Sequence, residues 1–90
     1  MRLDQFLRAS RLVLRRAVAQ ELCEAGAVSV NGMAARSSRA VRAGDEITVR
    51  RRDRLISVRV NAVPEVRQTS RAAAPALYEI IREEKLSEPE

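Results

Sequence analysis

Arginines near the start of the chain have the spacing of an anion-binding surface. If the first residues form a helix, Asp4, Arg8 and Arg11 fall on one face, because positions three and four apart are neighbours. Arg15 and Arg16 then stand in the first turn of a second helix. Free backbone N–H groups and the positive end of the helix dipole favour an anion there, typically a phosphate. These side chains predict contact with a polyanion.

Positive charge is concentrated in the first two thirds of the chain. Residues 1–60 hold thirteen arginines and six acidic residues, a net charge of +7, whereas residues 61–90 hold four basic and six acidic residues, a net charge of −2. A basic region of this kind is typical of a nucleic-acid-binding module. A merely solvated basic surface is the alternative. Codon bias would explain the choice of arginine over lysine, but not the uneven distribution.

Side chains suited to catalysis or metal binding are scarce. The sequence has no histidine and one cysteine, Cys23, so it offers no disulfide framework, no metal cluster and no activated thiol. Cys23 lies beside an apolar helical stripe and is expected to be buried. The acidic residues Asp45, Glu46 and Asp53 form no catalytic pair. We expect no enzymatic activity, no cofactor and no small-molecule substrate.

Two short helices must position the arginines. The first carries Leu3, Phe6 and Leu7 on one face and ends near Arg11. Ser10, in the link that follows, is available for a contact to the backbone or to a phosphate. Asp4 has two roles open to it: to cap the helix and pair with Arg8, or to hold Arg8 or Arg11 in place for RNA.

The second helix is predicted to run to about Ala25. Its apolar side would consist of Val18, Ala19, Leu22 and Ala25, and Gly26 supplies the left-handed residue that ends it.

Alternating apolar residues predict two hairpins after the helices. A strand over residues 27–30 leads through Asn31-Gly32, the preferred pair for a type I′ turn, into residues 33–35. Glu46–Arg50 and Leu55–Val60 form the second hairpin. Its tip, Arg50–Arg54, is either a solvated turn that discourages edge pairing or a second phosphate contact.

The end of the chain is predicted to be separate from this compact part. Pro64 is followed by a polar linker, Glu65–Arg71, and Pro75 is well placed to begin a short helix over Ala76–Lys85. The predicted fold class is α+β, with two short N-terminal helices packed on a small, mostly antiparallel sheet and a short C-terminal helix. Residues 1–62 would form the domain, and residues 63–90 the linker, helix and tail.

Neither end of the sequence predicts a membrane segment. Asp4 and Arg8 stand where a signal peptide needs an apolar stretch, and the longest run without a strongly polar residue, Ala72–Tyr78, is too short to span a bilayer. We expect a cytoplasmic protein with no membrane partner.

The ordered motifs of residues 1–50 resemble the S-four-type RNA-binding domain, also called the αL motif. The matching pieces are Arg2-Leu3-Asp4-Gln5-Phe6-Leu7, Ser10-Arg11, Arg16-Ala17, Gly26-Ala27-Val28-Ser29-Val30-Asn31-Gly32 and Gly44-Asp45. The size of the chain and its segment Ala76–Leu86 are similar to the stand-alone RqcP family of bacterial ribosome-associated quality control.

That resemblance implies a non-enzymatic RNA-binding factor. It would bind an obstructed large ribosomal subunit, contact large-subunit rRNA and peptidyl-tRNA, and support a partner protein that adds alanine tails without a template. The RNA-binding residues that the motif implies are Arg2, Asp4, Arg8, Ser10, Arg11, Arg16 and Asn31. Arg15 and the Arg50–Arg54 tip have suitable charge, although the motif does not require them.

Three alternatives remain open. The heat-shock-type ribosome-recycling relatives of this family usually carry a longer basic extension, whereas this chain ends acidic. A helix-turn-helix DNA-binding protein would present Gln20, Glu21 and Glu24 to the bases, which is a poor set beside a polyphosphate. A fragment of an RNA-modifying enzyme would need the catalytic pair that the sequence lacks.

Overall fold

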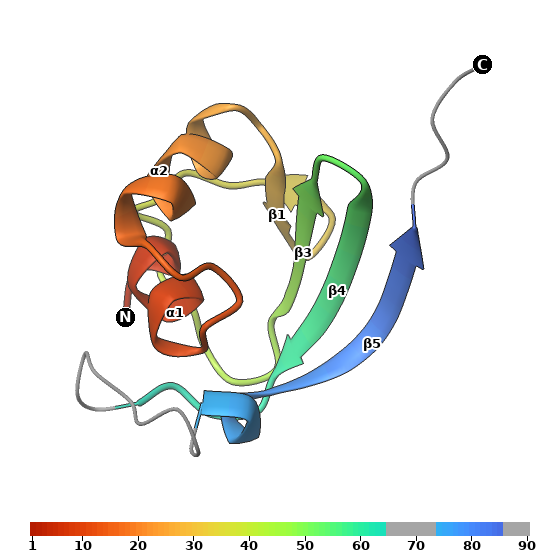
Figure 1. Cartoon of the computed structure of the whole chain (residues 1–90). Coiled ribbons are helices and arrows are strands. Elements are labelled where there is room, and N and C mark those ends of the chain that lie inside the picture. Colours follow the sequence, from red (N-terminus) through yellow and green to blue (C-terminus); the bar gives the residue numbers. More distant parts are fainter. Residues whose placement is uncertain (65–73, 86–90) are drawn as a thin grey trace.

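The protein is an antiparallel sheet with two short helices packed against it (Figure 1). The computed structural model describes residues 1–64 and 74–85. The strands follow the order β2-β1-β3-β4-β5. The elements are α1 (Leu3–Ala9), α2 (Arg16–Glu24), β1 (Val28–Val30), β2 (Met33–Ala34), β3 (Glu46–Arg51), β4 (Arg54–Val60), the 3-10 helix η1 (Ala74–Leu77) and β5 (Tyr78–Lys85). The predicted α+β class is confirmed.

The core lies between the helices and the sheet and is almost entirely aliphatic. Leu3, Phe6 and Leu7 of α1 are fully buried, as their helical spacing predicts. The sheet contributes the inward residues of β1, β3 and β4, and these are Val28, Val30, Ile47, Val49, Val58 and Val60. In β1 and β3 these residues alternate with exposed or half-exposed neighbours, as the period of two along a strand predicts, whereas in β4 Ser57 beside Val58 is also buried.

The apolar face of α2 differs slightly from the prediction. Ala19 and Cys23 are its buried residues, whereas Val18 and Leu22 are half-buried against the core. Ala25 was predicted to face inward but is exposed, because the helix ends at Glu24 and Ala25 is already its C-cap residue.

The turns that orient the sheet follow the predicted backbone chemistry. Asn31 and Gly32 both have positive φ, at 52° and 84°, and Val30 pairs with Met33 across them. A two-residue loop with positive φ at both positions is the type I′ pattern that asparagine and glycine favour. Gly26, with φ at 75°, directly follows the C-cap of α2 as predicted.

The predicted helix over Ala76–Lys85 is wrong. The chain makes only a turn of 3-10 helix up to Leu77 and then continues as β5, which pairs with β4 from Val60↔Tyr78 to Arg54↔Lys85. The edge of β4 would otherwise carry unpaired backbone groups next to the core, and β5 satisfies them. Helical propensity is a weak preference that such a non-local pairing overrides.

A bulge adjusts β5 to its neighbour. Ser57 pairs with Arg82 and Val58 with Ile80, so Ile81 is the extra residue in the register. Of the apolar residues predicted on one helical side, Leu77 is buried in the core, whereas Ile80 and Ile81 are largely exposed. The predicted linker Glu65–Arg71 lies outside the described residues, and the division of the chain after residue 62 stays a prediction.

Candidate nucleic-acid-binding surface

A buried carboxylate at the start of α1 organises the arginines of the surface. Asp4 is fully buried, and its side-chain oxygens accept hydrogen bonds from both helices. Oδ2 accepts from Arg16 Nε at 3.1 Å and from Gln20 Nε2 at 3.0 Å, both on α2. Oδ1 accepts from Arg2 Nε at 3.2 Å and from the backbone N–H of Gln5 at 2.9 Å. These bonds link α1, α2 and the residue before α1.

The hydrogen bonds keep Asp4 ionised. Burial by itself raises the pKa of Asp4, because it penalises the charged form. The hydrogen bonds from Gln20 and Arg16 and the positive charges of Arg2 and Arg16 outweigh burial, so the pKa lies below its ordinary value of 3.8. A carboxylate that stays charged in this position fixes the orientation of two guanidinium groups.

Both arginines remain accessible while they are held. Their side chains keep 44% (Arg2) and 45% (Arg16) of their surface exposed. The contact to Asp4 uses Nε in each case, and a guanidinium has five N–H donors in all. Each side chain therefore has further donors for an outside anion, and its position is fixed before the anion arrives. Preorganised arginines suit the bidentate recognition of phosphate.

The loop after β2 extends this surface. The backbone N–H of Asp4 donates to the Ser37 carbonyl at 3.1 Å, and that of Leu3 donates to the Arg39 carbonyl at 2.8 Å. Arg2, Cys23, Glu24, Arg36, Ser37 and Ser38 line a hollow of about 410 Å³ beside the Asp4 cluster. The structure therefore places this polar loop next to Arg2.

The predicted RNA-binding residues of the helical region differ in how exposed they are. Arg15 and Arg16 are exposed at the start of α2, and Arg8 is half-exposed on α1. Arg11 is half-exposed and has a left-handed backbone, with φ at 60°. Ser10 is buried, and its hydroxyl donates to the Leu7 carbonyl at 3.2 Å. Of the two contacts proposed for Ser10, the structure contains the one to the backbone.

The pairing of Asp4 differs from the one that helical spacing predicted. Arg8 was expected four residues later as its partner, but among the described residues Asp4 pairs with Arg2 and Arg16. The reason is geometric: burial of Asp4 between the helices turns it toward α2 and away from the exposed side of α1.

Asn31 belongs to a separate cluster at the β1–β2 turn. Its side-chain amide donates to Asp45 Oδ1 at 3.1 Å and accepts from the Glu46 backbone N–H at 3.0 Å. Asp45 also accepts from the Arg42 backbone N–H at 2.9 Å. The side chain of Asn31 therefore ties the turn to the start of β3, which leaves the exposed turn backbone for outside contacts.

Sequence reasoning missed Gln20 as a member of the Asp4 cluster. It was considered only as a base-reading position of a DNA-binding helix. Its spacing of four residues from Arg16 places both on the same face of α2, and that was the available signal. The contact to Asp4 spans sixteen residues, and no local pattern reports such a distance.

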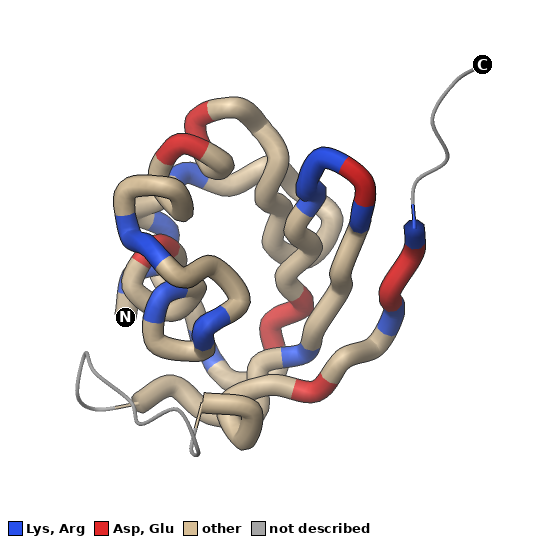
Figure 2. The backbone as a smooth tube through the Cα atoms, in the orientation of Figure 1, with Lys and Arg blue, Asp and Glu red and all other residues tan. Residues whose placement is uncertain are grey.

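The charges are distributed as the sequence predicts (Figure 2). Blue segments lie on α1, at the start of α2 and at the tip of the β3–β4 hairpin, whereas red and blue positions intersperse along β5.

Within residues 1–64 and 74–85, no three His, Cys, Asp or Glu side chains gather as metal ligands would. Neither described α-helix has the length and apolar composition needed to cross a bilayer.

The buried thiol fits the structural role predicted for it. Cys23 is 6% exposed, and burial, followed by the charges of Asp4 and Glu24, raises the pKa of its thiol above the ordinary value of 9.0. A protonated, buried thiol is a poor nucleophile. Cys23 therefore acts as a small apolar residue in the core.

Comparison with known proteins places this geometry in a family. The model of the S4 domain matches residues 1–47, which include α1, α2, β1 and β2. The RQC P-site tRNA stabilizing factor of Bacillus subtilis (strain 168) is 44% identical over 98% of this chain and 100% of its own length. Heat shock protein 15 of Escherichia coli (strain K12) is 37% identical over 88% of this chain and 59% of its own length.

A solved structure shares most of this architecture. The trimeric structure of Vibrio cholerae Heat Shock Protein 15 superposes with a TM-score of 0.80 and 31% sequence identity, over 89% of this chain and 80% of that one. The chain belongs to the S4 domain family and, over its full length, to the family of the RQC P-site tRNA stabilizing factors.

Proposed function

We propose that this protein is a non-enzymatic, cytoplasmic RNA-binding factor of ribosome-associated quality control. It binds a large ribosomal subunit that still carries peptidyl-tRNA, contacts both the large-subunit rRNA and the tRNA, and thereby supports a partner protein that adds alanine tails to the stalled chain. Relatives that match over nearly the full chain are named as P-site tRNA stabilizing factors, which supports the tRNA as a partner.

The observation that carries the proposal is the Asp4 cluster. Two arginines that are distant in sequence, Arg2 and Arg16, are fixed by one buried carboxylate and remain close to half exposed. Fixed cations on a surface of this kind match a rigid arrangement of phosphates better than flexible chains do, because less side-chain freedom is lost on binding. A folded RNA stem presents such an arrangement.

The proposed RNA-binding residues act in two ways. Arg2, Arg8, Arg11, Arg15 and Arg16 contact phosphates, together with the exposed backbone of the Asn31 turn. Asp4 and Ser10 are buried and act through their neighbours: Asp4 orients two arginines, and Ser10 holds the end of α1. Structured RNA should therefore be preferred to duplex DNA, since shape and backbone are recognised and base edges are not.

A heat-shock-type ribosome-recycling factor is the second candidate. The likeness to Heat Shock Protein 15 in both sequence and structure favours it. The greater likeness to the Bacillus subtilis factor, 44% identity over 98% of this chain against 37% over 88% for the Escherichia coli protein, favours the first candidate. A helix-turn-helix reading is weakened because Gln20, a candidate base-reading residue, already donates its amide to Asp4.

Binding measurements on structured RNA, single-stranded RNA and duplex DNA test the proposal. If about four to six arginines neutralise phosphates, the affinity for structured RNA should fall with salt with a log–log slope of roughly −3 to −5. Equal affinity for duplex DNA, or an affinity that does not change with salt, would contradict it.

A further inference from the structure

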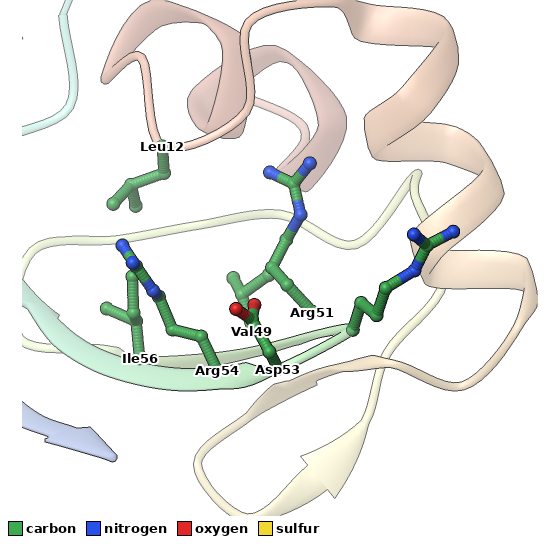
Figure 3. A pocket seen from close by; sticks show the side chains of 7 residues that line it. Leu12, Val49, Arg51, Asp53, Arg54 and Ile56 are labelled. Atoms are coloured by element: carbon green, nitrogen blue, oxygen red, sulfur yellow. The ribbon is translucent and has the colours of Figure 1, made fainter. Parts of the chain in front are cut away.

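A second hollow lies at the tip of the β3–β4 hairpin, outside the Asp4 cluster (Figure 3). Its volume is about 520 Å³, within the range of about 300–1,000 Å³ that is usual for ligand sites. The lining residues are Leu12, Val49, Arg51, Arg52, Asp53, Arg54 and Ile56. Leu12 lies in the connection between α1 and α2, and the other residues belong to the hairpin.

The hollow combines an apolar floor with a cationic rim. Val49 and Ile56 are directly opposite each other in the β3–β4 ladder and form the floor together with Leu12. Arg51 and Arg54 are the next opposed pair on the same face, because side chains alternate along a strand. Figure 3 shows both guanidinium groups extending from the hairpin on the side where Leu12 lies.

Cations gather at this rim beside one acidic residue of the hairpin tip, Asp53. Arg51 is directly opposite Arg54, and Arg54 is directly opposite Lys85 of β5, so three cations form a row across three strands. Like charges in directly opposite positions destabilise a sheet. Glu83 offsets the row only weakly, since its oxygen is 3.6 Å from Arg54 and both side chains are about half exposed.

The rim is continuous with the start of α2. Arg51 also lines a smaller hollow of about 190 Å³ together with Val13, Leu14, Arg15 and Val18. Leu14 is 70% exposed at this point. A nucleic acid strand that leaves the Asp4 cluster past Arg15 would meet Arg51 next.

We propose that the hairpin hollow binds an unpaired nucleotide of the RNA, a role that rests on the proposed RNA-binding function. The base packs against Leu12, Val49 and Ile56 and stacks on a guanidinium plane, and the flanking phosphates pair with Arg51 and Arg54. Single-stranded nucleotides are recognised by such a combination of stacking and charge, and arginine serves where aromatic residues are absent.

Two RNA probes test this inference with the full chain. One is a blunt stem-loop, and the other is the same stem-loop with a single-stranded 3′ extension of about six nucleotides, long enough for one such site. Wild type should bind the extended RNA roughly tenfold more tightly, the effect expected for one stacked base. In the Arg51→Ala/Arg54→Ala variant this preference should disappear, although the blunt RNA still binds.

Further variants separate stacking from charge. Leu12→Asn keeps the size of the side chain but makes the floor polar, so it should reduce the preference for the extended RNA without changing the salt slope. Arg59→Ala is the matched control: Arg59 is an exposed arginine of β4 outside the hollow, and the preference should survive its removal. Circular dichroism confirms that each variant is folded.

The outcomes are distinct. Equal affinity of wild type for both RNAs, or a preference that survives in the Arg51→Ala/Arg54→Ala variant, overturns this inference and leaves the proposed function standing. Binding of neither RNA overturns the proposed function and the inference with it. A peptide of leucine and glutamate tests whether the hollow binds protein instead. If this peptide displaces the extended RNA as effectively as unlabelled single-stranded RNA does, the hollow is a protein-docking site and the inference is wrong.

Discussion

The Nε atom of Arg16 lies 3.1 Å from Oδ2 of Asp4, although twelve residues separate the two in the chain. This contact joins the first turn of α2 to the first turn of α1. It holds a cation at the N-terminus of a helix, where the dipole disfavours one, and the buried carboxylate compensates for it. The contact thereby converts a flexible arginine into a fixed part of the surface.

Removal of Arg16 should affect binding more than folding. Arg16→Ala deletes one hydrogen bond to Asp4, but Gln20, Gln5 and Arg2 still satisfy the carboxylate. The fold should therefore persist, and RNA affinity should fall by about 1–3 kcal/mol, the loss expected for a hydrogen bond between charged groups. Circular dichroism and fluorescence anisotropy measure the two effects. Arg59→Ala is the control, and an Arg16→Ala protein that binds like wild type would show that the surface is assigned wrongly.

Acid should destabilise the protein through Asp4. Its pKa is lowered in the folded state, so the unfolded chain binds the proton more readily. The stability that Asp4 contributes is fully present above its ordinary value of 3.8 and is lost as the pH falls through the folded pKa. Chemical denaturation between about pH 7 and pH 2 should show this loss.

The matched variant is Asp4→Asn. Its amide brings N–H donors into a site filled by donors, so the free energy of unfolding at pH 7 should fall by about 1–3 kcal/mol. Its stability should also depend less on pH in the acid range than that of wild type. Parallel acid profiles for the two proteins would rule out Asp4 as the titrating group.

Leu77 and Ile80, which were predicted on one side of a helix, differ in burial because the chain continues from η1 into the strand β5. Leu77 is 8% exposed, so Leu77→Ala should lower the free energy of unfolding by about 2–4 kcal/mol. Ile80 is 53% exposed, so Ile80→Ala should change it by less than about 1 kcal/mol. A helix with one apolar side would make the two substitutions similar. Similar losses in denaturant unfolding would therefore speak for the helix that the sequence suggested.

The side chain of Asn31 should matter for stability and its backbone for RNA. Asn31→Gly keeps a residue that tolerates the positive φ of 52° but removes the bonds to Asp45 and Glu46. We expect a loss of about 1 kcal/mol in the free energy of unfolding, with RNA affinity nearly unchanged. If affinity falls while the melting temperature stays constant, the amide itself contacts RNA.

Much of the fold could be predicted because its determinants are local. The helical spacing of Leu3, Phe6 and Leu7 and the Asn31-Gly32 turn specify their own structures. The strand β5 could not be predicted in this way, since its conformation depends on the edge of β4, whose paired residues lie 18 to 31 positions earlier in the chain.

The sequence indicated which residues belong to the site, but not which of them contact one another. Arginine-rich character and the motif resemblance indicated Arg2, Asp4 and Arg16, but local spacing paired Asp4 with Arg8. Two of the actual partners, Arg16 and Gln20, are twelve and sixteen residues from Asp4 and meet it only because the two helices pack together. The part played by Gln20 follows from that packing and not from any pattern within one helix.

Co-sedimentation with ribosomal particles tests the central claim most directly. Tagged wild-type protein should be recovered with free large subunits, most strongly with those that retain peptidyl-tRNA, and little with intact ribosomes, whose small subunit covers the intersubunit RNA. The Arg2→Ala/Arg16→Ala variant should lose this recovery, whereas Arg59→Ala should keep it. Preferential recovery with small subunits or intact ribosomes, or a double variant that sediments like wild type, would contradict the account.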